Sequence, residues 1–306
     1  MYEILFKKKH PKIQFIPSFV HAGRVKKLTI FAQNFKMVFF PNAKINLGLF
    51  VTGKRPDGYH NIQSLLFPVP LCDALEIMDA ADGVTDLSTS GIAVNGDKNN
   101  NLVLKAWEML KHDFDLPPVK IHLHKAIPSG AGLGGGSADA AFAIRLVDQH
   151  FQLHLSGVEM RNYAGRLGMD CPFFINNEPA LATQRGDSLE PVEISLSGKY
   201  ILIVKPACHI STREAYKGVE PADPGIALPE ALNKPVIQWK YLVKNDFEKP
   251  VFRSCPEIKT IKERLYDLGA DFALMTGSGS AVYALFDRVV DLRSKFPGCF
   301  YFGKQL

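Results

Sequence analysis

The feature that most constrains the fold of this chain is a run of glycines. Five of the seven residues in Gly130–Gly136 are glycine. Each glycine costs conformational entropy when it is ordered, so the interiors of helices and strands disfavour such a run. It fits a place where the backbone approaches another group closely and presents its N–H groups. The chain is therefore expected to form a specialised loop here.

The segments on either side put this glycine loop between a strand and a helix. Residues 119–125 alternate apolar and polar side chains, as a half-buried strand does. Residues 137–150 carry Ala, Ile and Leu at helical spacing. Because a helix N-terminus has partial positive charge and free N–H donors, it is a ready anion site. The order predicts a phosphate-binding loop, and an ordinary glycine-rich turn is the alternative.

Two common nucleotide-binding loops do not fit. A Walker A loop ends in Gly-Lys-Ser/Thr, and no lysine lies between Gly130 and Ala141. Gly130, Gly132 and Gly135 match G-x-G-x-x-G, but a dinucleotide fold needs a second parallel strand after the helix. Residues 156–168 instead have the pattern of a second helix. A nicotinamide oxidoreductase is therefore disfavoured.

The composition is that of an ordinary globular protein, with 306 residues, 46% hydrophobic and 22% charged. This length suffices for one large or two medium domains. The net charge of +5 is uneven, because residues 1–36 hold eight Lys or Arg and one acid, which leaves −2 for residues 37–306. We expect no nucleic acid as a partner of the main body. No run of 18 apolar residues occurs, so we expect no membrane span.

Residues 1–36 are interpreted as a basic extension outside the fold. They lack the apolar core of a secretory signal. Met37 stands just before the first recognisable motif. We therefore interpret the extension as a disordered tail or the product of an upstream start codon.

The five cysteines are scattered, and none forms a C-x-x-C pair: Cys72, Cys171, Cys208, Cys255 and Cys299. This spacing predicts free thiols in a reducing cytosol rather than a disulfide framework or a zinc site. The expected location is the cytoplasm.

Periodicity and turn residues predict the remaining elements. Strands are expected at residues 38–51, 62–70, 74–78, 200–205, 272–275 and 281–286, and helices at 102–112, 211–217 and 255–269. Residues 79–101 and the proline-rich segment 220–235 are expected to be loops. A break falls near residues 195–199.

Two segments before the glycine loop carry candidate site residues. Lys44 lies within an apolar strand pattern, where a buried ammonium needs a partner. Asn46 lies two residues later and so on the same face of the strand. Tyr59 and His60 follow a tight turn and offer an aromatic face beside a ring donor and acceptor. The plain alternatives are a solvent-facing lysine, a packed tyrosine and an exposed histidine.

Two segments after the glycine loop are equally suggestive. Asp170 follows a helix and precedes Cys171-Pro172 and an aromatic pair, so it is suited to take a proton from a hydroxyl. Residues 276–280, Thr-Gly-Ser-Gly-Ser, are small and hydroxylic and allow close approach to a ligand. The alternatives are a helix-capping aspartate and a hairpin connection.

Together these motifs resemble the GHMP kinases. The residues that fit the family's phosphate-loop pattern P-x-x-x-G-L-G-G/S-S-x-A are Pro128, Gly132, Leu133, Gly134, Ser137 and Ala138. The patterns P-x-A-K-x-N-L, x-D-G-Y-H, G-x-D-x-P-F-F and T-G-S-G-S resemble one branch of the family. That branch phosphorylates a cytidine diphosphate derivative of methylerythritol in the non-mevalonate isoprenoid pathway. The resemblance covers residues 37 to about 290.

The resemblance implies an α+β fold of two domains. Residues 37–195 would form a GHMP domain similar to the second domain of ribosomal protein S5, and residues 196–306 a ferredoxin-like domain. It implies a small-molecule kinase that uses ATP and Mg²⁺, as a monomer or homodimer. A homoserine or mevalonate kinase is the alternative within the family, and Tyr59-His60 argues against it. A catalytically inactive ATP-binding module is disfavoured by the presence of Lys44 and Asp170.

The resemblance also assigns roles by position. Lys44 and Asp170 correspond to the catalytic pair. The implied ATP-binding residues are Asn101, Leu102, Lys125, Pro128, Ser129, Gly130, Ala131, Gly132, Leu133, Gly134, Gly135, Gly136, Ser137 and Ala138. The implied substrate-binding residues are Asn46, Tyr59, His60 and Tyr216. Ser137 is the candidate metal contact, and Cys171 stands where a small apolar residue is more usual.

Overall fold

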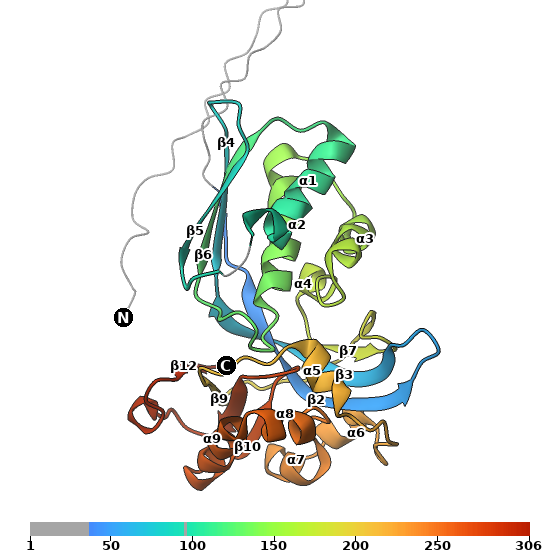
Figure 1. Cartoon of the computed structure of the whole chain (residues 1–306), viewed down its shortest axis with the longest axis vertical. Coiled ribbons are helices and arrows are strands. Elements are labelled where there is room, and N and C mark those ends of the chain that lie inside the picture. The colour runs from blue at the N-terminus through green and yellow to red at the C-terminus, as the bar shows by residue number, and fades with distance from the viewer. Residues whose placement is uncertain (1–36, 95–96) are drawn as a thin grey trace, which may run out of the picture. The chain divides into compact units, whose positions relative to one another are not determined.

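Three four-stranded sheets organise the part of the chain that the computed structural model describes, residues 37–94 and 97–306 (Figure 1). Helices and sheets are mixed along the chain, which confirms the predicted α+β class. The prediction for the extension, residues 1–36, lies outside the described residues. The predicted domain boundary at residues 195–196 stays a prediction.

The first sheet carries helices on its apolar face. Its order is β1-β4-β6-β5, and all neighbours are antiparallel except that β5 runs parallel to β6. The strands are β1 (Met37–Phe39), β4 (Ala74–Asp79), β5 (Asp86–Gly91) and β6 (Val119–Lys125). Helices α1 (Leu102–Phe114) and α2 (Gly135–Phe151) pack on it. Trp107, Ile121 and Ile144 belong to the resulting core.

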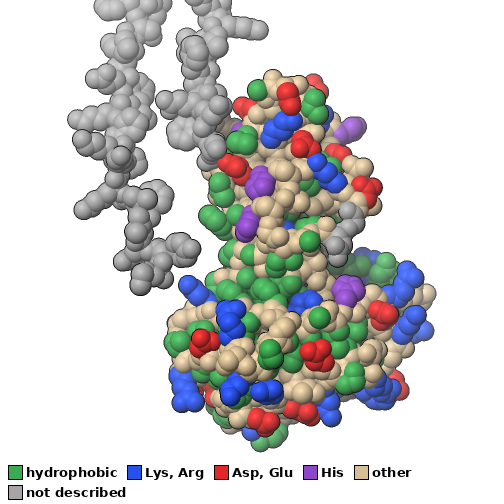
Figure 2. Space-filling view, turned by 60° about the vertical axis from the view of Figure 1, so that its left-hand side comes forward, with side chains coloured by type: hydrophobic (Ala, Val, Ile, Leu, Met, Phe, Trp, Pro, Cys, Tyr) green, Lys and Arg blue, Asp and Glu red, His purple; other side chains and the backbone are tan. Residues whose placement is uncertain are grey.

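The other face of this sheet is polar. Ser88 Oγ lies 2.8 Å from His122 Nδ1, and Ser90 Oγ lies 2.9 Å from both His122 Nε2 and His124 Nδ1. Figure 2, which turns this side of the molecule forward, shows histidine side chains on the surface. The alternation in β6 therefore separates a core face from a polar face, as the sequence predicts.

The second sheet is antiparallel, in the order β2-β3-β7-β8. Its strands are β2 (Asn42–Lys54), β3 (His60–Cys72), β7 (Ala180–Thr183) and β8 (Ser188–Pro191). The first ten residues of β2 are all buried. Apolar and polar side chains alternate from Asn42 to Leu47, and because both faces are buried the polar ones need partners inside the protein. Lys44 and Asn46 lie within this buried stretch.

The third sheet is covered on both faces. Its order is β10-β11-β9-β12, and its strands are β9 (Tyr200–Lys205), β10 (Phe272–Met275), β11 (Val282–Phe286) and β12 (Phe300–Gln305). Helices α8 (Glu248–Ser254) and α9 (Pro256–Asp267) share a core with one face. Ile203 and Leu274 of the other face share a core with Ile45 of β2. The second sheet therefore packs against the third sheet through β2.

Short helices complete the fold, and several differ from the sequence predictions. They are α3 (Gly157–Leu167), α4 (Phe173–Asn176), α5 (Thr212–Lys217), α6 (Leu228–Leu232) and α7 (Val236–Leu242), with 3-10 turns at Lys98–Asn100 and Arg293–Lys295. The predicted loop 79–101 contains β5, whose sequence is polar apart from the buried Leu87. The predicted loop 220–235 contains α6, because Pro229 lies in the first turn, where a missing N–H costs nothing.

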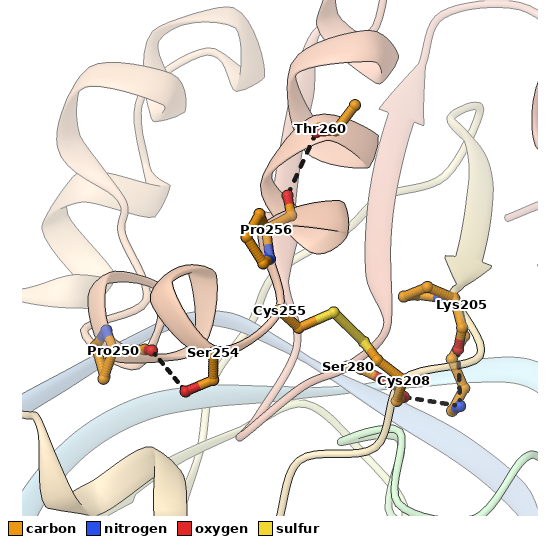
Figure 3. Close-up of a disulfide and its surroundings, with 9 residues drawn as sticks. Lys205, Cys208, Pro250, Ser254, Cys255, Pro256, Thr260 and Ser280 are labelled. Atoms are coloured by element: carbon orange, nitrogen blue, oxygen red, sulfur yellow. Dashed lines mark hydrogen bonds between the residues drawn. A yellow bond between two sulfur atoms is a disulfide. The ribbon is translucent and has the colours of Figure 1, made fainter.

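The prediction of free thiols is wrong for two of the five cysteines. Cys208, in the segment after β9, and Cys255, at the N-terminus of α9, form a disulfide (Figure 3). Cys72, Cys171 and Cys299 are free. The two paired residues are 47 positions apart, and the packing of α9 on the third sheet brings them together. Among the described residues, no helix is both long and apolar enough to cross a bilayer.

Candidate active site

A cavity of about 1170 Å³ brings together most of the predicted site residues. The glycine loop, the buried end of β2, the turn before β3 and the start of α5 all line it. Small-ligand pockets usually measure roughly 300–1,000 Å³. This cavity therefore has room for two ligands at once.

The glycine loop joins β6 to α2 and presents the helix N-terminus to the cavity. Gly134 caps α2 with a φ of 72°, and among the described residues this cap makes no side-chain hydrogen bond. The N–H groups of the first turn, together with the positive end of the helix dipole, are suited to bind an anion. Gly130 and Gly132 also have positive φ, of 60° and 74°. These positive φ angles are a conformation that favours glycine at all three positions.

Two neighbouring segments hold the loop in place. The Leu133 carbonyl accepts a hydrogen bond of 2.9 Å from Lys44 N on β2, and the Ala131 carbonyl accepts one of 3.2 Å from Ala281 N. A Cβ on Gly132 would lie 2.0 Å from the carbonyl oxygen of Thr276. The segment 276–280 therefore packs directly on the glycine loop, and only glycine fits at this contact.

Lys44 and Asp170 face one another at the cavity wall. Lys44 Nζ lies 3.5 Å from Asp170 Oδ2 and donates a hydrogen bond of 2.7 Å to Asn46 Oδ1. The lysine side chain is 5% exposed and the aspartate side chain 42%. The buried ammonium thus has the partners it needs, while the carboxylate remains accessible to a substrate hydroxyl. Asp170 reaches this position because α3 ends just before it, at Gly168.

Asn46 is the centre of a buried hydrogen-bond network. Its Nδ2 donates to Ser64 Oγ at 2.7 Å, and its Oδ1 accepts from both Lys44 Nζ and Thr276 Oγ1. The Tyr283 hydroxyl donates to its backbone carbonyl at 3.0 Å. These contacts fix the direction of the Lys44 side chain. The small, hydroxylic residues 276–280 predict a site segment that contains Thr276, but nothing in the sequence predicts that Thr276 and Ser64 orient the lysine.

The predicted substrate-binding aromatic residues line the same cavity. His60 and Tyr216 are stacked, with ring centroids 4.9 Å apart and an angle of 24° between the planes. Tyr59 is half-exposed, and the Arg185 guanidinium lies 5.6 Å from the centre of its ring. The structure therefore brings Tyr216 beside His60, although α5 is remote in sequence. Arg185, from the turn between β7 and β8, also lines the cavity, and no motif of the sequence predicts it.

Three of the implied ATP-binding residues do not face the cavity freely. Asn101 caps α1, where its side chain accepts a hydrogen bond of 2.9 Å from Val103 N. Ala138 is fully buried in α2. Lys125 lines the cavity but is 5% exposed and paired with two buried carboxylates, Asp73 and Asp139. Burial, offset in part by Lys125, raises the pKa of Asp139 to about 7. Nothing in the spacing of the sequence predicts this cluster.

Comparisons with known proteins agree with this geometry. The family model described as "GHMP kinases N terminal domain" matches residues 101–178, and the one described as "GHMP kinases C terminal" matches residues 233–300. A 4-diphosphocytidyl-2-C-methyl-D-erythritol kinase of Bacteroides fragilis is 47% identical over 273 residues, which cover 88% of this chain and the whole of that protein.

Two solved structures of kinases are also similar to this chain. The crystal structure of a 4-(cytidine 5'-diphospho)-2C-methyl-D-erythritol kinase matches with a TM-score of 0.68 and 32% identity, over 81% of this chain and 90% of that one. The mevalonate kinase of Methanococcus jannaschii matches with a TM-score of 0.67 but 15% identity, over 87% and 97% of the two chains. The second likeness is one of fold alone.

Proposed function

The chain belongs to the 4-diphosphocytidyl-2-C-methyl-D-erythritol kinases, a family of GHMP kinases, and from this we propose its reaction. It transfers the γ-phosphoryl group of ATP to a hydroxyl of 4-diphosphocytidyl-2-C-methyl-D-erythritol. The observation that carries the proposal is the accessible carboxylate of Asp170, 3.5 Å from the buried Lys44 ammonium, in the cavity that the glycine loop also lines.

The chemistry follows from this pair. Asp170 takes the proton of the substrate hydroxyl as the oxygen attacks the γ-phosphorus and the bond to the leaving ADP breaks. The Lys44 ammonium, 3.5 Å from Asp170 Oδ2, holds the carboxylate in position at the cavity wall. The same ammonium offsets charge on the transferred group. The free N–H groups at the start of α2 hold the phosphates of ATP.

Mg²⁺ is the metal that such a reaction takes. It binds through one or two carboxylates together with substrate phosphates and water. The Ser137 hydroxyl and the Asp170 carboxylate both line the cavity, and their hard oxygens suit this ion. When bound, it neutralises charge on the phosphates of ATP.

The aromatic residues supply the selectivity for cytidine. Tyr59, His60 and Tyr216 line the cavity and offer aromatic faces for the base. A base stacked on such a ring gains about 1–3 kcal/mol. The His60 ring also offers a nitrogen that can hydrogen-bond the edge of the base. This bond favours cytosine over other bases, because a base with the wrong edge leaves a polar group unpaired.

A coupled assay of ADP release tests the proposal. The panel is 4-diphosphocytidyl-2-C-methyl-D-erythritol, its uridine analogue, mevalonate and homoserine, each with saturating ATP. We expect the highest kcat/KM with the cytidylated alcohol. A higher value with mevalonate or homoserine would favour the other small-alcohol kinases of the family instead.

A further inference from the structure

A buried cluster of charges lies directly beneath the glycine loop and takes no part in the chemistry described above. Its members are Asp73, Lys125 and Asp139, whose side chains are 0%, 5% and 4% exposed. Lys125 Nζ donates to Asp139 Oδ2 at 2.7 Å and also donates to Asp73 Oδ2. Two buried carboxylates thus share one ammonium.

The cluster connects both ends of the glycine loop. Asp73, between β3 and β4, accepts backbone hydrogen bonds from Ala126 N at 2.6 Å and Ile127 N at 2.8 Å, where the loop leaves β6. Asp139 lies in α2, just beyond the end of the loop. Lys125 joins the two acids. The entry and the exit of the loop are therefore tied to one ammonium group.

The ammonium also lies close to the backbone that begins α2. A Cβ added to Gly135 would lie 3.3 Å from Lys125 Nζ. Gly135 is the first residue of the helix, so the ammonium lies beside the backbone that carries the first N–H groups of α2.

Stability alone is a weak reason for such a cluster. Burying charged groups carries a large desolvation cost, and apolar residues of similar volume often stabilise a protein as well or better. Asp139 Oδ1 is buried and has no hydrogen-bond partner among the described residues. A cluster that leaves a carboxylate oxygen unsatisfied is more readily explained by the geometry that it imposes.

We propose that Asp73, Lys125 and Asp139 are positioning residues that set the separation between the two ends of the glycine loop, and hence its fit to the phosphates of ATP. The inference rests on the proposed function. Lys125 then acts on ATP through the loop, because its ammonium is already bound to two carboxylates. This differs from the contact with adenosine that the family resemblance implies for it.

The test is the affinity for ATP of Asp139→Asn and Asp139→Ala, measured by calorimetry without the alcohol. The asparagine keeps the shape but removes the negative charge that faces the Lys125 ammonium, so an ion pair becomes a hydrogen bond to a neutral acceptor, and we expect Kd for ATP to rise about tenfold. The alanine removes the tie, and we expect a rise of about 10–100-fold. KM for the cytidylated alcohol should stay within about twofold in both variants, because its pocket is not tied to the cluster.

Asp79→Asn is the matched control. Asp79 Oδ1 lies 2.8 Å from His150 Nε2, in the last turn of α2. Asp79 therefore contacts the end of this helix, whereas Asp139 lies near its start. ATP affinity should not change in this variant. If Asp139→Asn and Asp139→Ala bind ATP as the wild type does, or if both substrates are weakened equally, the cluster is merely structural and the proposal is overturned.

The binding measurement separates this inference from the proposed reaction. If the wild type binds ATP but phosphorylates none of the alcohols, the proposed substrate is wrong and the positioning role can still be read from Kd. If Asp139→Ala does not fold, the isosteric Asp139→Asn decides alone, with its melting temperature measured alongside.

Discussion

At the scale of single residues, the partners of Lys44 explain a lysine inside an apolar strand. Asn46 and Asp170 satisfy its ammonium, and Thr276 orients Asn46. The sequence alone predicts that this lysine needs a partner, because an unpaired buried charge is costly. It cannot identify Thr276, which lies 230 residues after Asn46. Pairs of this kind depend on packing between sheets rather than on local pattern.

The first prediction concerns Asp170. Asp170→Asn keeps the shape of the side chain but cannot accept a proton, so we expect kcat to fall roughly 10²–10⁴-fold. Melting temperature should change little, because the aspartate is nearly half-exposed. The control is Asp82→Asn, which removes a surface partner of Lys120. If Asp170→Asn keeps wild-type kcat, a different group takes the proton.

The second prediction concerns Tyr59. Tyr59→Ala should raise KM for the cytidylated alcohol about 5–150-fold, following the energy of stacking on one ring. KM for ATP should stay unchanged, since ATP binds at the glycine loop. His60→Ala should in addition reduce the difference in KM between the cytidine and uridine analogues. Steady-state kinetics with both analogues checks this.

Tyr241→Ala is the control for Tyr59→Ala, because Tyr241 is an exposed tyrosine of α7 outside the cavity. An equal rise of KM for both substrates in Tyr59→Ala would mean that the ring supports the fold rather than the base.

At the scale of elements, the most predictable part is the strand, glycine loop and helix. Its signal is local, since the positive φ of Gly134 demands glycine and the flanking periodicity is strong. The least predictable elements are β5 and α6. Each buries only one to three residues, so neither leaves a long periodic pattern.

The third prediction concerns Gly134. A Cβ there would lie 2.9 Å from Phe174 Cζ and 3.0 Å from Lys44 Cγ, at a φ of 72°. Gly134→Ala should therefore disturb both the loop and the side chain of Lys44. We expect KM for ATP to rise at least about tenfold and kcat to fall as well. The reason is that the strained backbone at position 134 and the displaced neighbouring side chains together cost more than about 1.4 kcal/mol. Steady-state kinetics with varied ATP checks both constants.

The control for this substitution is Gly83→Ala. Gly83 has a φ of 71° but no neighbour within 4 Å of its added Cβ, so the variant carries the backbone strain without the clash. Its kinetic constants should match the wild type. If Gly134→Ala matches them too, the loop tolerates the shift and its geometry matters less than we infer.

At the scale of the whole molecule, the site draws on all three sheets. Lys44 comes from the second, Thr276 follows a strand of the third, and the glycine loop follows β6 of the first. The local motifs predict which segments take part. The Cys208–Cys255 disulfide and the cluster around Lys125 are not predictable, because each joins residues that only the complete fold brings together.

The fourth prediction concerns residues 1–36. Among the described residues, those that line the cavity lie between Lys44 and Ser278, and the Bacteroides fragilis relative is matched over its whole length by 88% of this chain. We expect removal of residues 1–36 to leave kcat/KM within about twofold, because every motif of the family resemblance lies after position 36. Kinetics and melting temperature of the truncated chain check this. Insolubility or loss of activity would assign the extension to the fold.

The hydrogen bonds between Asn46 and Thr276 also have a consequence for the order in which the enzyme becomes active during its synthesis. A ribosome that has made the glycine loop, Lys44 and Asp170 has still not made the residue that orients the lysine, 230 positions after Asn46. A nascent chain can thus form the first sheet with its helices early, since domains fold as units while they emerge. Phosphoryl transfer, by contrast, has to wait until the third sheet leaves the exit tunnel.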